Sequence, residues 1–166
     1  MEGVQLIEGK ARILGDNISG DQIIAGRYLS GNVSIEKAVE HLFESCRPDL
    51  AASFQPGDIL VAGHNFGCGS SREHVLQVLY VAGVKCVIAK SFSRSFFRGG
   101  INMGILPIQA VINVTEFDSV KVDLQSSTIC VNDDNNFYSF SPFPQELQAI
   151  IRAGGLINFF RKHQSL

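Results

Sequence analysis

Hydrophobic positions along this chain follow two different spacings, which predict strands and helices in alternation. Three short, wholly apolar runs predict strands that are buried on both faces: residues 59–62, 86–89 and 105–108. Between them, residues 75–82 carry apolar side chains at helical spacing, and residues 91–104 predict a short helix that ends at the pair Gly99-Gly100. Strands that alternate with helices in this way favour a parallel α/β core.

The flanking regions have other patterns. Before the core, the pattern predicts a strand at residues 3–14 and a helix at residues 34–43 that begins at Ser34. After the core, it predicts an antiparallel meander at residues 120–124, 128–131 and 137–140. A helix then runs from Pro144 to Gly154-Gly155, and residues 156–160 are expected to pack back on the core. No repeat or linker interrupts the chain, so a single domain is expected over residues 1–166. The fold class is α/β, a small parallel sheet with helices plus an antiparallel meander.

Composition narrows the classes of function. The chain has 166 residues, 45% of them hydrophobic, and 14 basic and 16 acidic residues without a block of like charge, so no nucleic-acid or membrane partner is expected. No apolar run reaches the roughly 20 residues of a spanning helix, and no signal segment is recognisable, which favours the cytoplasm. The four cysteines and four histidines are dispersed, and we expect reduced thiols and no metal ligands in this chain.

The segment from Gly63 to Gly83 holds the most distinctive chemistry. Its first part has three glycines, two serines and an arginine: Gly63, Gly67, Gly69, Ser70, Ser71 and Arg72. The spacing from Ser70 to Glu73 is that of a capping box, so we expect this loop to deliver two hydroxyls and a guanidinium to a helix N-terminus, where an anion is favoured. The alternative is that Ser70 only caps the helix and Arg72 is solvated. No P-loop or nucleophile-elbow pattern is present.

Residues 15–32 form a second unusual segment, rich in Gly, Asn, Asp and Ser. Loops of this length without structure of their own are usually functional or disordered. Apolar residues within it provide anchoring points, namely Ile18, Ile23, Ile24 and Leu29. We therefore expect an ordered, functional loop.

Three segments together resemble a known family. GDNISGDQIIAGRYL (residues 15–29), NFGCGSSREH (residues 65–74) and VIAKSFSRSFFRGGINMGILPI (residues 87–108) are similar to the small subunit of the 3-isopropylmalate dehydratases, in the aconitase superfamily. The resemblance covers nearly the whole chain and implies the swivelling β/β/α domain of that superfamily. Two departures lie in the first segment, where Gly20 and Ala25 replace the Thr and Pro that are common in the family.

The resemblance also implies roles for individual residues. Ser70 matches the base that removes a proton from the substrate carbon, Ser71 and Arg72 match the residues that bind a substrate carboxylate, and Asp21 matches the aspartate of the first loop. Ser30 follows the Tyr-Leu pair, where family members select the variable group of the substrate, and homoaconitases tend to have an arginine there. Arg94 matches a residue that shapes the pocket or the subunit interface, and Cys68 is not expected to be a ligand.

By the same resemblance, the four-iron four-sulfur cluster is carried by a large subunit, and this chain is inactive without that partner. The expected substrate is a small diacid, with 2-isopropylmalate first. Substrates of the homoaconitase, citramalate or dimethylmalate type remain open, as does self-association of the isolated chain. A different interpretation is a non-catalytic, anion-binding regulatory domain, against which the joint presence of Ser70, Arg72 and Asp21 argues.

Overall fold

The computed structural model describes residues 6–69, 73–133 and 135–164, and the strands within them form one seven-stranded sheet. The strands are β1 (Leu6–Ile13), β2 (Ile59–Ala62), β3 (Cys86–Ala89), β4 (Leu106–Gln109), β5 (Ser119–Asp123), β6 (Thr128–Val131) and β7 (Asn136–Ser139), in the order β4-β3-β2-β1-β5-β6-β7. The helices are α1 (Gly20–Ile23), the 3₁₀ turn η1 (Gly26–Tyr28), α2 (Ile35–Val39), α3 (Pro48–Ser53), α4 (Glu73–Val81), α5 (Arg94–Met103), α6 (Gln145–Ala153) and α7 (Leu156–Gln164).

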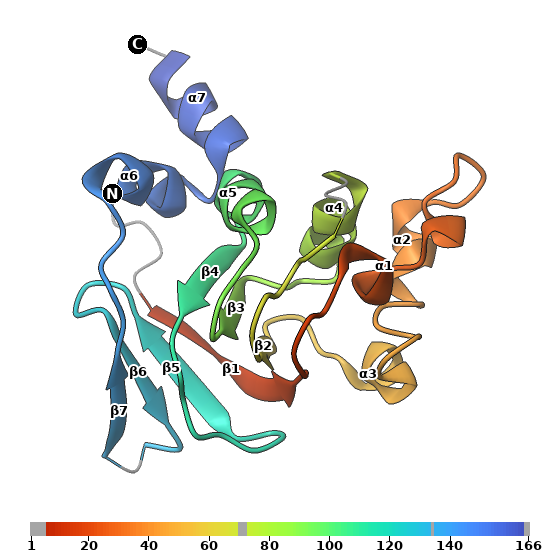
Figure 1. Cartoon of the computed structure of the whole chain (residues 1–166). Helices are drawn as coiled ribbons and strands as arrows, with labels where there is room; N and C mark the ends of the chain where they lie inside the picture. Colours follow the sequence, from red (N-terminus) through yellow and green to blue (C-terminus); the bar gives the residue numbers. More distant parts are fainter. Residues whose placement is uncertain (1–5, 70–72, 134, 165–166) are drawn as a thin grey trace.

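Strand β1 joins the two halves of the sheet. Its first five residues pair antiparallel with β5, whereas its last three pair parallel with β2. The parallel half continues through β3 to β4, and the antiparallel half continues through β6 to β7. Helices α1 to α5 lie on the side of the parallel strands that faces away from the meander (Figure 1). The result is a β/β/α arrangement, and the predicted fold class is confirmed.

The parallel half and the antiparallel half of the sheet are the two β layers of the molecule. Side chains of the central strands alternate between two cores, one on each face of the parallel half. Leu60 of β2 and Val87 of β3 belong to the core beneath the helices, and their neighbours Ile59 and Ile88 belong to the core between the two β layers. Residues that point in opposite directions along a strand are thus all buried. This explains why the predicted strands are apolar throughout and do not alternate.

Two helical predictions need correction. The expected end of a helix at Gly99-Gly100 is wrong, because α5 continues to Met103 and ends at Gly104 with φ 95°. A Cβ on Gly99 would lie 2.6 Å from Leu76 of α4, so this glycine allows close packing of two helices. The predicted helix at residues 34–43 begins at Ser34 as expected, but α2 already ends at Val39.

The C-terminal segment also differs from its prediction. We expected residues 156–160 to pack on the core, but they begin α7, which contacts α5 and α6 and has no buried hydrophobic residue. Ile157 and Phe160 are 67% and 52% exposed. Helical spacing alone could not assign the buried face of this helix. No helix in the described parts of the chain is long and apolar enough to cross a membrane.

Candidate functional site

Three loops leave the C-terminal ends of β1, β2 and β3 and run side by side; we call residues 14–20, 63–69 and 90–93 the first, second and third exit loops (Figure 1). Main-chain hydrogen bonds join the first to the second: Gly63 N to Gly15 O at 3.0 Å, Asn17 N to His64 O at 2.8 Å, Gly67 N to Ile18 O at 2.7 Å, and Gly20 N to Cys68 O at 3.1 Å. The parallel pairing of the strands therefore continues beyond the sheet, and it brings the three sequence motifs together.

The second exit loop is held equally on its other side. Phe66 donates its N–H to Ser91 O and accepts the N–H of Ser93, both at 3.0 Å. The Ser93 hydroxyl then has two partners, because it donates to Gly67 O at 2.8 Å and accepts the N–H of Phe96 at 3.2 Å. Ser93 thereby caps α5 and attaches its first turn to the glycine-rich loop.

Close packing explains the glycines of the second exit loop. A Cβ on Gly63 would overlap the carboxylate of Asp16, and a Cβ on Gly67 would overlap the side chain of Phe96. Gly67 also has φ 79°, in the left-handed region that favours glycine. The glycine pattern that drew attention in the sequence thus has a structural basis in the contact between neighbouring loops.

Two asparagines in the exit loops were not singled out by sequence reasoning. Asn17 and Asn65 have φ 55° and 61°, and the Asn65 amide donates to Asn17 Oδ1 at 3.2 Å. The N–H of Asn65 also donates to Ser91 Oγ at 2.8 Å. Asparagine adopts the left-handed region more readily than other non-glycine residues, and such residues gather at functional sites. The signal in the sequence was an Asn just after each of two predicted strands.

The expected loop at residues 15–32 is ordered and presents Asp21 on a short helix. Ser19 caps α1, because its hydroxyl accepts the N–H of Gln22 at 3.2 Å and the Gln22 side chain accepts the N–H of Ser19 at 2.9 Å. Asp21 is therefore not the N-cap of α1. Its side chain is exposed and forms no hydrogen bond or ion pair with any residue that the structure describes. Such a carboxylate is available for a partner.

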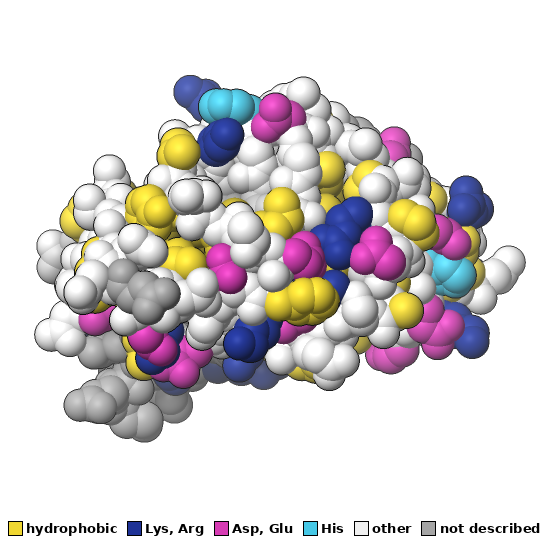
Figure 2. Space-filling view, turned by 90° about the horizontal axis from the view of Figure 1, so that it is seen from below, with side chains coloured by type: hydrophobic (Ala, Val, Ile, Leu, Met, Phe, Trp, Pro, Cys, Tyr) yellow, Lys and Arg dark blue, Asp and Glu magenta, His cyan; other side chains and the backbone are white. Residues whose placement is uncertain are grey.

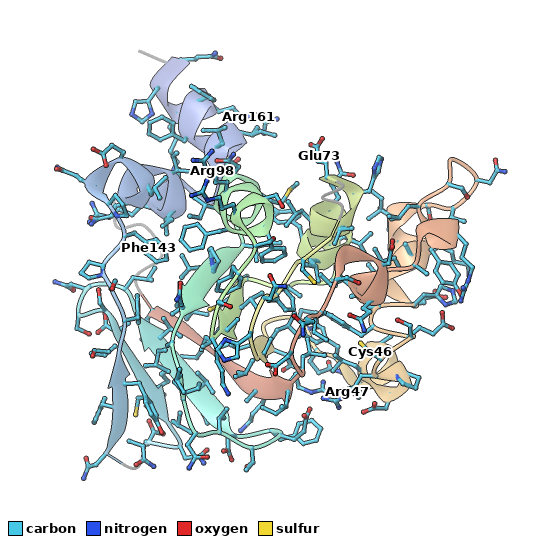
Figure 3. The ribbon with its side chains drawn as sticks, in the orientation of Figure 1. Cys46, Arg47, Glu73, Arg98, Phe143 and Arg161 are labelled. Atoms are coloured by element: carbon cyan, nitrogen blue, oxygen red, sulfur yellow. The ribbon has the colours of Figure 1, made fainter. Side chains whose placement is uncertain are left out.

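The remaining predicted site residues divide into two groups. Ser30 is exposed just after η1, and its hydroxyl donates to Arg27 O at 3.4 Å, while Arg94 is exposed at the start of α5. The other three, Ser70, Ser71 and Arg72, lie outside the described residues, so the predicted capping box is not tested. Their described neighbours are Gly69, where an added Cβ would lie 3.8 Å from the Ser19 side chain, and the exposed Glu73, at the first turn of α4 (Figure 3).

A buried group of charged residues, which we call the Arg12 cluster, was also missed. The Arg12 guanidinium is fully buried and donates to Glu116 at 2.6 Å, to Asp58 at 3.1 Å and to Ser53 O at 3.0 Å. Arg47 donates to the other oxygen of Glu116 at 2.8 Å. Partial burial raises the pKa of Glu116, but the hydrogen bonds from Arg12 and Arg47 outweigh it, and the pKa is lowered. The available signal was an arginine at an otherwise apolar end of a predicted strand, between Ala11 and Ile13.

Cysteines and other metal-binding side chains are scattered. Among the described residues, no group of three or more His, Cys, Asp or Glu could hold a metal ion. Cys68 is a partly buried free thiol in the second exit loop. Cys86 is buried in β3, and the loss of solvent raises the pKa of its thiol far above the ordinary value. On the face shown in Figure 2, acidic and basic side chains are interspersed without a broad patch of one charge.

Comparisons with known proteins agree with this geometry. The family model of the aconitase C-terminal domain matches residues 24–112. The chain is 38% identical over 162 residues to 3-isopropylmalate dehydratase small subunit 1 of Thermotoga maritima, covering 96% of this chain and 98% of the relative. It is 41% identical over 162 residues to the methanogen homoaconitase small subunit of Methanothermobacter thermautotrophicus, covering 98% and 94%.

A solved structure extends the comparison to the fold. The crystal structure of a 3-isopropylmalate dehydratase from Methanocaldococcus jannaschii aligns with a TM-score of 0.89 at 35% sequence identity, over 96% of this chain and 95% of that one. Both β layers and the helical layer are included in an alignment of this extent. The chain therefore belongs to the aconitase C-terminal domain family, among the small subunits of the 3-isopropylmalate dehydratase and homoaconitase type.

Proposed function

We propose that this chain is the small subunit of a hydro-lyase that isomerises 2-isopropylmalate to 3-isopropylmalate in leucine biosynthesis. One observation carries the proposal: the first and second exit loops are paired at Ser19 and Cys68. Asp21 follows Ser19 by two residues, and Ser70 follows Cys68 by two residues. Two motifs that are about 50 residues apart in the chain are thus anchored at one place.

The proposed chemistry begins with removal of a proton from the substrate carbon by Ser70. A serine acts as a base only where its alkoxide is stabilised, and the N-terminus of α4 provides a favourable dipole. Ser71 and Arg72 bind a substrate carboxylate, for which the guanidinium fork has the matching geometry. Asp21 orients the serine or the substrate hydroxyl, and Ser30 faces the variable group. As the C–H bond breaks, the substrate hydroxyl leaves from the neighbouring carbon as hydroxide and the alkene forms. In the rehydration, hydroxide adds to the carbon that lost the proton, and Ser70 returns the proton to the carbon that lost the hydroxyl.

The proposal requires a large subunit as partner. A four-iron four-sulfur cluster on that subunit would supply a Lewis acid for the substrate hydroxyl. The described residues of this chain provide no ligand set for such a cluster. Their contribution is instead to position the base and the carboxylate-binding residues, so the isolated chain is expected to be inactive.

A second candidate is a homoaconitase, which acts on a substrate with an additional carboxylate. It is favoured by the 41% identity to the methanogen homoaconitase small subunit, which is similar to the identity with the dehydratase subunits. Citramalate and dimethylmalate types are further possibilities within the same chemistry. A panel of these substrates, assayed with the reconstituted pair, distinguishes the candidates.

The test of the proposed base is Ser70→Ala in the complex with the cognate large subunit. We expect turnover to fall roughly 10²–10⁴-fold, which is the usual contribution of a general acid–base group, while the two subunits still co-elute on size exclusion. Ser141→Ala, at an exposed serine between β7 and α6, is the matched control and should retain full activity. Unimpaired turnover by Ser70→Ala would refute the assignment, and activity of the isolated chain would refute the need for a partner.

A further inference from the structure

Four side chains from two separate segments form a partly exposed group beside Ser30, which we call the Arg27 cluster. It comprises Arg27 and Tyr28 of η1 and His41 and Glu44, which follow α2. The Tyr28 hydroxyl donates to Glu44 Oε2 at 2.8 Å, and the Tyr28 ring stacks on His41 with centroids 3.9 Å apart and planes 6° apart. Stacking and a hydrogen bond together fix the orientation of the tyrosine.

The same cluster fixes the guanidinium of Arg27. It lies 4.7 Å from the centroid of the Tyr28 ring, and its Nη2 contacts the Tyr28 hydroxyl at 3.2 Å and Glu44 Oε2 at 3.4 Å. His41 Nδ1 lies 3.5 Å from the other Glu44 oxygen. Hydrogen bonding by Tyr28 lowers the pKa of Glu44, so this carboxylate is charged at neutral pH. Arg27 is thus held between a ring and an anion.

The cluster borders the segment that follows η1. Ser30 donates its hydroxyl to Arg27 O at 3.4 Å and accepts the N–H of Val33 at 3.0 Å, so the chain turns back at this point. Arg27 is the basic residue nearest to Ser30 in the sequence. The other basic residues of this region have acidic partners of their own, Lys37 with Glu40 and Arg47 with Asp49. Among the described residues of this segment, Arg27 is therefore the candidate cation for a distal carboxylate.

We propose that the Arg27 cluster is a specificity element of the substrate site, in which Glu44 and Tyr28 retain the Arg27 guanidinium so that the site selects diacids with an uncharged variable group. A substrate with a third carboxylate at that position would meet the charge of Glu44 and would find no released cation. The inference rests on the proposed function and adds to it how the site would reject a substrate of the homoaconitase type.

The test is Glu44→Gln in the complex with the cognate large subunit. We expect the ratio of kcat/KM for homocitrate-type substrates to that for isopropylmalate to rise about tenfold, mainly through KM, because charge-assisted hydrogen bonds to a released guanidinium favour the third carboxylate. Glu40→Gln removes another exposed carboxylate, which pairs with Lys37, and it should leave the ratio unchanged.

Two further variants separate release of Arg27 from a general disturbance. In the double variant Arg27→Ala with Glu44→Gln, the gain should disappear, because the cation that produces it is absent. Tyr28→Phe keeps the stacking on His41 but removes the hydroxyl, so it should give a smaller shift in the same direction.

The outcomes distinguish this inference from the proposed function. An active wild-type complex whose substrate ratio does not respond to Glu44→Gln would overturn the inference alone. A wild-type complex that prefers the substrate with the distal carboxylate would do the same. A wild-type complex that dehydrates none of these acids would overturn the proposed function, and with it the specificity element.

Discussion

Arg12 and Arg27 have similar surroundings but opposite exposure. Each lies over an aromatic ring, Arg12 at 4.8 Å from Phe117 and Arg27 at 4.7 Å from Tyr28, and each contacts a glutamate. The Arg12 side chain is fully buried, whereas that of Arg27 is 69% exposed. Solvent screens the Arg27–Glu44 pair but not the buried contacts of Arg12. The two groups therefore differ far more in their contribution to the free energy of unfolding than in geometry.

The comparison shows how this chain separates stability from function. The Arg12 cluster joins β1 to α3 and to the segment before β5, and its donors and acceptors satisfy one another. The exit loops and the Arg27 cluster are held instead by main-chain bonds and exposed contacts, and they present Asp21 and Ser30 to solvent. Charges inside the scaffold are paired, and charges beside the site remain accessible.

The largest effect is expected from Arg12→Ala. Removing the guanidinium leaves Asp58 and Glu116 without their buried partner, which costs about 3–5 kcal/mol. In a chain of this size, that loss lowers Tm by roughly 10 °C. Arg27→Ala is the matched control and should change the free energy of unfolding far less, because solvent screens its exposed ion pair. Urea unfolding of both variants decides the matter, and losses of equal size would contradict the contrast between the two clusters.

The next largest effect tests the backbone packing of the second exit loop. Gly67→Ala introduces a Cβ in the left-handed region and against Phe96, for which we expect a loss of about 2–3 kcal/mol. Gly69→Ala has a similar φ of 83°, but its Cβ would make only an ordinary contact with Ser19 at 3.8 Å, so it should cost only about 1 kcal/mol. Thermal unfolding measures both, and equal losses would show that the contact with Phe96 is unimportant.

The sequence allowed the scaffold to be predicted from local patterns. Residues 59–62 and 86–89 coincide with β2 and β3, and Ser34 caps α2 as expected, because short apolar runs and capping side chains are local signals. The end of α5 was missed for a reason that is not local. Gly99 serves a contact with Leu76, and nothing in its immediate neighbours distinguishes such a glycine from a helix terminator.

The site was accessible to sequence reasoning only in part. Motif resemblance located the segments of Asp21 and Ser70, but it could not show that they are attached through Ser19 and Cys68. The Arg12 and Arg27 clusters were missed, because their members come from distant parts of the chain, as Arg12 and Glu116 do. Side-chain contacts between remote segments depend on the tertiary fold, and composition and periodicity do not encode them.

A smaller effect is expected at acid pH. The pKa of Glu116 is lowered from its ordinary value of 4.5, so its contribution to stability is complete above that value and is lost as the pH falls through the lowered pKa. Urea unfolding from pH 7 to pH 3 should therefore show a smaller acid loss for Glu116→Gln than for the wild type. The pKa of Glu44 is lowered as well, but solvent screens this exposed carboxylate, so Glu44→Gln should reduce the acid loss less than Glu116→Gln does. The reverse order would contradict the assignment of stability to the Arg12 cluster.

The smallest effect on stability is expected from Tyr28→Phe. The variant removes one exposed hydrogen bond to Glu44 and keeps the ring that stacks on His41, so the free energy of unfolding should change by less than about 1 kcal/mol. If the Arg27 cluster serves specificity, the same substitution must alter substrate preference in the reconstituted complex. A large loss of stability with unchanged substrate preference would instead give Tyr28 a structural role like that of Arg12, because a purely structural contact changes the free energy of unfolding without changing substrate preference.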